Sequence, residues 1–129
     1  MGDLNTGFGS TVTPAGVTSS GIDNTGTDSS GFNNGVSNDT SGFRNAITAG
    51  FASAFNNSGD SLVGFNNSGL ANRGFGNTGQ FNAGFFISGS TNSGISRSGI
   101  SSSGIGNWGD HDAGAFNTGD NRSGIFGQP

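Results

Sequence analysis

The sequence predicts an all-β fold, a pentapeptide-repeat β-solenoid (β-helix) in which short turns of chain stack on one another. Three observations point to it. From Gly59 to Gly124 a glycine stands at every fifth position, fourteen times in a row. Asparagine recurs in phase with these glycines, and so do Phe and Ile directly after them. A beat of five fits neither the period of a helix nor that of a lone strand, so it indicates a repeat architecture.

A ten-residue period is superimposed on the five-residue period. After alternate glycines the next residue is always apolar, whereas the intervening positions are mostly polar. If turns of chain stack, each apolar residue lands on its equivalent in the next turn, about 4.8 Å away. We therefore expect the large members of this column to point inward as the structural core: Phe65, Phe75, Phe85, Ile95, Ile105 and Ile125.

The repeat leaves two sizes of coil open. Four pentapeptide sides would make a quadrilateral coil of about 20 residues, which we favour, and a flattened coil of about ten residues is the alternative. Glycine is expected where a Cβ would clash or where φ is positive. Asparagine tolerates such corners, and its amides can form stacked ladders. Because six inward side chains bury little apolar area, hydrogen bonds between coils must supply much of the stability.

Residues 1–129 are expected to form a single repeat domain with three parts. The beat is less regular over 1–36 and regular over 59–127. Over 37–58 the register breaks, since Phe43, Ile47, Phe51 and Phe55 are four apart and alanines cluster among them. We favour irregular coil that continues the solenoid here, with a short helix as the alternative.

Composition restricts the function classes. The net charge is only −4 and the twelve Phe are in phase, which favours order over disorder. There is no Cys for disulfide or thiolate chemistry, and the four Arg are widely spaced, so no basic stripe for nucleic acid is expected. No apolar run is long enough for a membrane span, and the first residues lack the pattern of a signal peptide.

Few residues suggest chemistry. Asp110, His111 and Asp112 form the one dense polar cluster, but neighbours on a strand alternate in direction, and no second His or Cys exists to complete a site. We therefore expect no catalytic residues, no metal site and no cofactor. Trp108 stands where other repeats carry Ser or Thr, so it is expected to be partly exposed and to contact a partner.

The stretch Phe65-Asn66-Asn67-Ser68-Gly69-Leu70-Ala71-Asn72-Arg73-Gly74-Phe75-Gly76-Asn77-Thr78-Gly79 resembles the tandem repeats of the mycobacterial PPE (Pro-Pro-Glu) family, in its major polymorphic tandem repeat subgroup. The likeness covers most of the chain but not that family's helical Pro-Pro-Glu N-terminal domain. The resemblance implies a β-solenoid on a secreted, envelope-associated protein, with a host or envelope protein as partner.

The expected function is that of a non-catalytic structural or surface-interaction module. Uncapped solenoid ends are open sheet edges, so homo-oligomers joined end to end are expected. The alternative is a macromolecular mimic or inhibitor that binds a protein through one face, as the acidic gyrase inhibitors of the broader pentapeptide-repeat superfamily do. The eight Asp are spread thinly for that role, and a clustered acidic wall would favour it.

Overall fold

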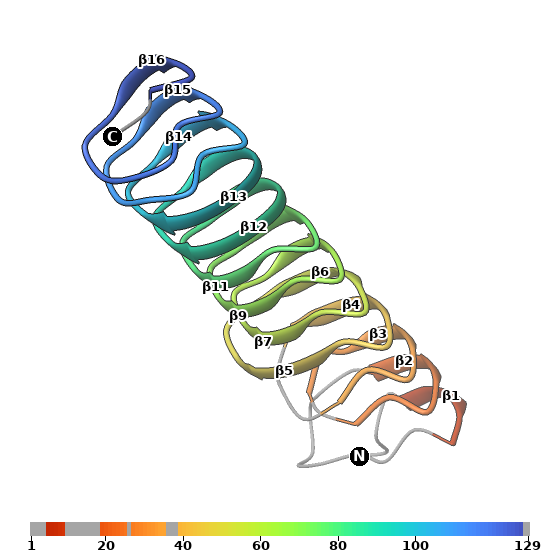
Figure 1. Cartoon of the computed structure of the whole chain (residues 1–129). Coiled ribbons are helices and arrows are strands. Elements are labelled where there is room, and N and C mark those ends of the chain that lie inside the picture. The colour runs from red at the N-terminus through yellow and green to blue at the C-terminus, as the bar shows by residue number, and fades with distance from the viewer. Residues whose placement is uncertain (1–4, 10–18, 26, 36–38, 128–129) are drawn as a thin grey trace. The chain divides into compact units, whose positions relative to one another are not determined.

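The computed structural model describes residues 5–9, 19–25, 27–35 and 39–127, and every regular element in these ranges is a β-strand. The chain divides into two compact units, Met1–Asn66 and Asn67–Pro129. In each unit the strands pair in parallel with strands one coil away, as the stacked ribbons of Figure 1 show. The predicted β-solenoid is confirmed.

The N-terminal unit stacks strands on two walls. Its β5 and β7 pair with each other, and its other strands pair in the order β1-β2-β3-β4-β6-β8. The bounds are β1 (Asn5–Phe8), β2 (Ser19–Ile22), β3 (Ser30–Phe32), β4 (Thr40–Phe43), β5 (Ala46–Ala49), β6 (Ala52–Phe55), β7 (Ser58–Asp60) and β8 (Val63–Phe65).

The C-terminal unit has the same plan. One wall, called here the Phe wall, holds β10 (Arg73–Phe75), the first halves of β12 (Ala83–Ser90) and β13 (Ser93–Ile100), β14 (Ser103–Ile105), β15 (Ala113–Ala115) and β16 (Ser123–Ile125). The second wall holds β9 (Ser68–Leu70), β11 (Thr78–Gln80) and the second halves of β12 and β13.

The coil has ten residues, not 20. Gly74 pairs with Gly84, Gly84 with Gly94 and Gly94 with Gly104, so each glycine lies beside the one ten residues on. The favoured quadrilateral coil is therefore wrong, and the ten-residue alternative is confirmed. Both sizes keep like residues in register, but only the smaller one lets two pentapeptides close a complete turn.

The irregular stretch predicted over 37–58 continues the solenoid. Residues 37 and 38 lie outside the described residues, and residues 39–58 contain β4, β5, β6 and the start of β7, with no helix. The short-helix alternative is therefore wrong. Pairing steps lengthen here, from Ser30 to Ser41 and from Ser41 to Ser53, and a bulge lies between Ile47 and Ala49.

The interior is built of asparagine amides rather than phenylalanines. Asn82 is 1 % exposed, and its Nδ2 donates to the carbonyls of Thr78 and Gly89, each at 3.0 Å. Its Oδ1 accepts the backbone N–H of Asn92 at 3.0 Å. The same bonds recur ten residues away, so every amide ties its own coil to the following one. Two such ladders run through the C-terminal unit, at positions 67, 77, 107, 117 and 72, 82, 92.

The N-terminal unit contains one ladder of this kind and one apolar cluster. The backbone N–H groups of Asn34, Asn45 and Asn57 donate to the Oδ1 atom of the preceding asparagine of the ladder, which begins at Asn24. Beside it, Ile47, Ala52 and Leu62 form a small buried cluster. The predicted amide ladders are therefore confirmed, and they occupy the core.

Glycine at the repeat position is a steric requirement. Gly104 has φ +112°, and a Cβ placed on it would overlap the backbone carbonyl oxygen of Gly114 in the next coil. Side chains other than glycine rarely adopt this conformation, and a backbone atom cannot move aside as a flexible side chain can. The predicted role of glycine is confirmed, and it explains why the beat is uninterrupted where the coils are regular.

Two residues after each such glycine the chain turns through the left-handed region. Most of these positions are not glycine: Ala71, Phe81, Thr91 and Ser101 have φ between 53° and 60° on one side of the C-terminal unit. The turn is fixed by backbone bonds between coils, as in Phe81 N–H to Leu70 C=O at 2.8 Å and Thr91 N–H to Gln80 C=O at 2.9 Å. The fold thus carries local strain at its corners.

Thr91→Asn is expected to stabilise the protein by about 1 kcal/mol, because a β-branched residue is strained at φ 60° whereas asparagine enters this region readily. Urea unfolding followed by circular dichroism measures the change. Ser90→Asn, next to it on the strand, is the control and should change stability by less than about 0.5 kcal/mol. A loss of stability in Thr91→Asn would contradict the strain assigned to this corner.

Candidate interaction surface

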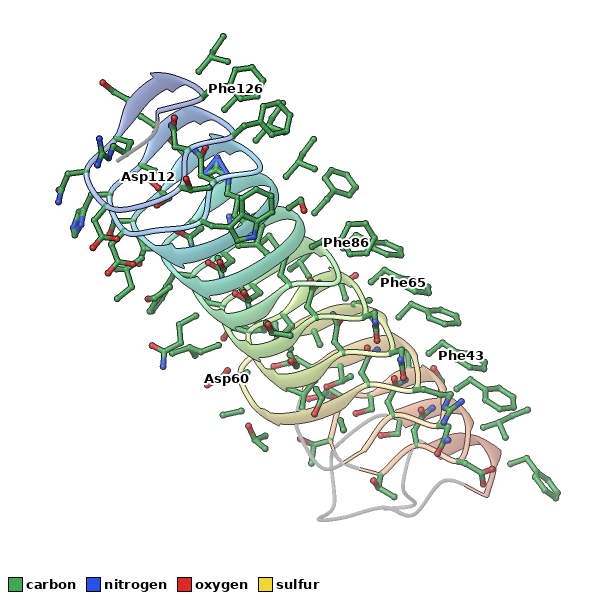
Figure 2. All side chains as sticks on the ribbon, in the orientation of Figure 1. Phe43, Asp60, Phe65, Phe86, Asp112 and Phe126 are labelled. Carbon is green, nitrogen blue, oxygen red and sulfur yellow. The ribbon has the colours of Figure 1, made fainter. Side chains whose placement is uncertain are left out.

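The predicted core column lies on the outside. Phe65, Phe75, Phe85, Ile95, Ile105 and Ile125 are exposed by 40, 36, 52, 44, 46 and 70 %. Placing them in the core was therefore wrong. Figure 2 shows the labelled Phe43 and Phe65 of the N-terminal unit, and Phe86 and Phe126 of the C-terminal unit, projecting away from the ribbon.

Strand alternation explains the inversion. Within one pentapeptide the asparagine comes three residues before the Phe or Ile, as in Asn82 and Phe85, and residues an odd number apart point to opposite sides of a strand. Only one of the two can face inward. A ten-residue coil brings its walls so close that one amide reaches carbonyls of the opposite wall, so the interior fits asparagine and not phenylalanine.

The expected stacking of equivalent side chains in neighbouring coils is present, but on the outer surface. In the N-terminal unit the ring centroids of Phe32 and Phe43 are 5.2 Å apart, and those of Phe43 and Phe55, and of Phe55 and Phe65, are each 4.8 Å apart. The ring planes differ by 6–13°. Such stacking stabilises neighbouring coils while the ring edges stay in water. The aromatic column is thus a surface feature with the period of the coil.

The C-terminal unit carries a broader apolar surface on its Phe wall, called here the Phe face. Its ridge is the outward column after the glycines: Phe75, Phe85, Ile95, Ile105 and Ile125. Beside the ridge, corner aromatics lie at Phe86, Phe116 and Phe126. Phe116 and Phe126 stack at 5.3 Å, and Phe86 meets Phe75 edge-on at 5.3 Å.

On the other side of the ridge lies a furrow of small residues, the outward positions just before the glycines. These are all exposed: Ala83, Ser93, Ser103, Ala113 and Ser123. Between ridge and furrow stand the glycines, which have no side chain. Across the wall, the Phe face therefore changes from the large side chains of the ridge to the small side chains of the furrow. Along the stack of coils, this pattern repeats once per coil. From Ala83 to Phe126 none of its columns carries a charged side chain.

The structure separates the residues of the Asp110-His111-Asp112 cluster. Asp110 lies outside and accepts the backbone N–H of Ile100 at 2.8 Å, while its own N–H donates to Asp120 Oδ1 at 3.0 Å. His111 is exposed at a corner with φ 60°, and Asp112 is 1 % exposed and points into the coil. No group of metal-binding side chains occurs among the described residues. These three side chains do not converge on one site.

Two buried charges replace asparagines in the ladders. Arg97 is 2 % exposed, and its Nε donates to the carbonyl of Gly104 at 2.9 Å, as an asparagine Nδ2 would. Asp112 Oδ1 accepts the N–H of Arg122 at 2.8 Å. The Nη atoms of Arg97 and Oδ2 of Asp112 are buried without hydrogen bonds. Burial lowers the pKa of Arg97, and the charge of Asp112 partly offsets this.

The double variant Arg97→Asn/Asp112→Asn is expected to be more stable than the wild type by about 1–4 kcal/mol, because it places an amide at one more position of each ladder and removes two poorly bonded buried charges. Arg97→Leu alone should cost about 3–5 kcal/mol, since Asp112 is left buried without its counter-charge. Denaturant unfolding of both variants checks this. Equal stability of the single and double variants would show that the two charges do not interact.

Two further surface features are the exposed Trp108 and the surface carboxylates. Trp108 is 50 % exposed and bridges Ser98 and Thr118 on the second wall, which agrees with its expected exposure; its contact with a partner stays a prediction. The described carboxylates occur as short columns, such as Asp110 and Asp120, rather than as a continuous acidic wall. The arrangement that would favour a mimic is therefore not seen in the described ranges.

The two interior charges were missed by sequence reasoning, although a signal was present. Arg97 and Asp112 both stand at the asparagine position of the pentapeptide, two residues before a glycine. Once that position is known to face inward, a charged side chain there is expected to point into the coil. The exposed Arg73, one residue nearer its glycine, is not constrained in this way.

Comparison with known proteins leaves the fold without a named relative. No family model matches the chain, and neither curated proteins nor solved structures contain a significant match. In the described residues no helix has the length and hydropathy needed to cross a membrane. The findings establish a repetitive parallel β-solenoid with buried asparagine ladders and an exposed apolar face.

Proposed function

We propose that this chain is a non-catalytic structural and surface-interaction module. The observation that carries the proposal is the inverted distribution of side chains, with amides inside and aromatic residues outside. The interior amides use their hydrogen-bonding capacity within the ladders. The outer columns instead present apolar side chains at a fixed spacing, and exposed apolar patches of this kind are typical of sites that bind other macromolecules.

We also propose that the chain is related to the PPE tandem repeats. A ten-residue coil built from two Asn-x-Gly pentapeptides suits the PPE tandem repeats that the sequence resembles, and with that resemblance go secretion or display on the cell envelope and a host or envelope protein as partner. Stacked coils that expose columns of side chains on their outer walls suit display at a surface.

End-to-end assembly is a further part of the proposal. β16 pairs with β15, and no strand pairs with its other edge among the described residues. A Cβ added to Gly124 in β16 would meet no atom within 4 Å, whereas one on Gly114 would overlap the next coil. Unpaired strand edges accept further strands through backbone hydrogen bonds. A second chain could therefore continue the parallel ladder.

Sedimentation velocity over a wide concentration range, with electron microscopy of the same samples, tests the function. The structural module is expected to associate, and end-joined species should lengthen as concentration rises. Ser123→Pro removes an N–H from the outer edge of β16 and should shorten them. A chain that stays monomeric at the highest concentrations and shows no contact with envelope proteins would contradict the proposal.

A further inference from the structure

We propose that the Phe face of the C-terminal unit is the contact surface of a lateral homodimer, in which a second copy packs its own Phe face against it. This inference specifies a partner for the surface-interaction role proposed above and in that sense rests on it. It concerns the side of the solenoid, whereas end-to-end growth concerns its strand edges, so separate variants distinguish the two modes.

The area of the face suits a dimer. The exposed parts of its ridge and corner side chains add up to roughly four whole side chains, or on the order of 600–1,000 Å² at 150–250 Å² for each large aromatic. A stable interface of standard size takes about 800 Å² from each partner. The Phe face thus supplies the required area from one wall of one unit.

The shape of the Phe face is complementary to the Phe face of a second copy. The ridge of Phe and Ile and the furrow of Ala and Ser run side by side along the same strands, and both repeat once per coil. In a two-fold pair, the ridge of each copy would lie in the furrow of the other. The repeat of about 5 Å, seen in the 5.3 Å stack of Phe116 on Phe126, is shared only by a partner with the same coil rise. A second copy satisfies this over the whole wall.

Charge also favours a second copy. The chain has a net charge of −4, so two copies repel each other least when the contact is made through an uncharged surface that keeps their acidic groups apart. The columns of the Phe face are uncharged from Ala83 to Phe126, and the centres of protein interfaces are depleted of charge in the same way. A bilayer is the less suitable occupant, because no cluster of basic side chains flanks the face to meet lipid headgroups.

The test compares two double variants of the full chain. Phe85→Ser/Ile105→Ser alters the ridge, whose two side chains are half exposed, so the fold should survive. Phe81→Ser/Ile100→Ser makes the same chemical change away from the Phe face, at a corner next to the second wall and on that wall, where the side chains are 55 and 48 % exposed. Circular dichroism and the melting temperature show whether each variant is folded.

Sedimentation equilibrium of the wild type is expected to show a dimer. The ridge variant should raise its dissociation constant by at least about a hundredfold, at roughly tenfold for each interface anchor removed, and the second-wall variant by less than about threefold. Each measurement is made at concentrations below those at which end-joined species form, because Ser123 belongs to the furrow and its substitution would alter the Phe face itself. A monomeric wild type under these conditions, or equal effects of the two variants, would overturn the proposal.

Three outcomes separate this inference from the proposed function. One outcome is association that Ser123→Pro stops and that the ridge variant does not change. This outcome would refute the lateral dimer but would still support the structural module. A dimer lost only in the ridge variant supports the inference even if no end-to-end growth occurs. Binding to phosphatidylcholine vesicles that the ridge variant abolishes, with no dimer in solution, would assign the face to a lipid surface and overturn the proposal.

Discussion

Replacing Asn82 by alanine is expected to lower the free energy of unfolding by about 3–5 kcal/mol. The change removes one side-chain acceptor and two donors, and so leaves the carbonyls of Thr78 and Gly89 and the N–H of Asn92 without these partners in the interior. An unsatisfied buried polar group costs about 1–3 kcal/mol. Urea unfolding followed by circular dichroism measures the loss.

Gln80→Ala is the matched control. It also removes an amide side chain from the same coil, but Gln80 is exposed, so its loss should change stability by less than about 0.5 kcal/mol. Asn82→Leu separates the hydrogen bonds from simple filling of space, because it keeps an interior side chain of similar volume, as Leu62 is in the N-terminal unit. If Asn82→Ala proved as stable as Gln80→Ala, the amide ladder would not hold the coils together.

Gly104→Ala is expected to cost at least about 4 kcal/mol or to prevent folding, the largest effect of any substitution considered for this chain. The added Cβ would overlap the carbonyl oxygen of Gly114, and both groups belong to backbones that are fixed by pairing between coils. Overlap with backbone cannot be relieved by rotating a side chain. Thermal unfolding, or the loss of β signal in the far ultraviolet, measures the effect.

Gly124→Ala provides the comparison, because Gly124 has nearly the same φ, +106° against +112°, and no atom within 4 Å of the added Cβ. Its cost should be the backbone strain alone, about 1–3 kcal/mol. The difference between the two variants therefore isolates the collision between coils. Similar losses in both would mean that φ alone, and not stacking, demands glycine.

Much of the fold could be predicted because a repeat of fixed length restricts the architecture. The glycine beat implied stacked parallel coils, and the pairing of Gly84 with Gly94 confirms it. The amide ladders followed from phased asparagines. The size of the coil could not be predicted, because residues ten apart stay in register whether a turn holds ten residues or 20.

The face of the apolar column was predicted wrongly for an identifiable reason. Phe and Ile usually fill interiors because their burial is favourable, but a coil with two close walls has room for one inward residue per pentapeptide. Alternation shows that Asn82 and Phe85 cannot share a side, and the sequence does not reveal which of them faces inward. The hydrogen bonds available to an amide between two walls decide it.

The stretch around Ile47 shows how the repeat tolerates exceptions. Ile47 and Ala54 pair with Gly59 and Gly64, so each stands where its partner strand has a glycine, and neither has positive φ. The coil between Asn45 and Asn57 is longer by two residues, and Ile47 turns inward onto Leu62. A spacing of four among apolar residues therefore reflects a widened coil here rather than a helix.

Hydrogen exchange of the side-chain amides tests the central claim, that the asparagines lie inside and the aromatic residues outside. In a nuclear magnetic resonance measurement on the folded chain, the Nδ2 protons of Asn72 and Asn82, bonded to carbonyls of their own coil and of the next one, should exchange slowly. The side-chain amide of the exposed Gln80 should exchange at the rate of an unfolded chain. Equally fast exchange at all three would contradict the account.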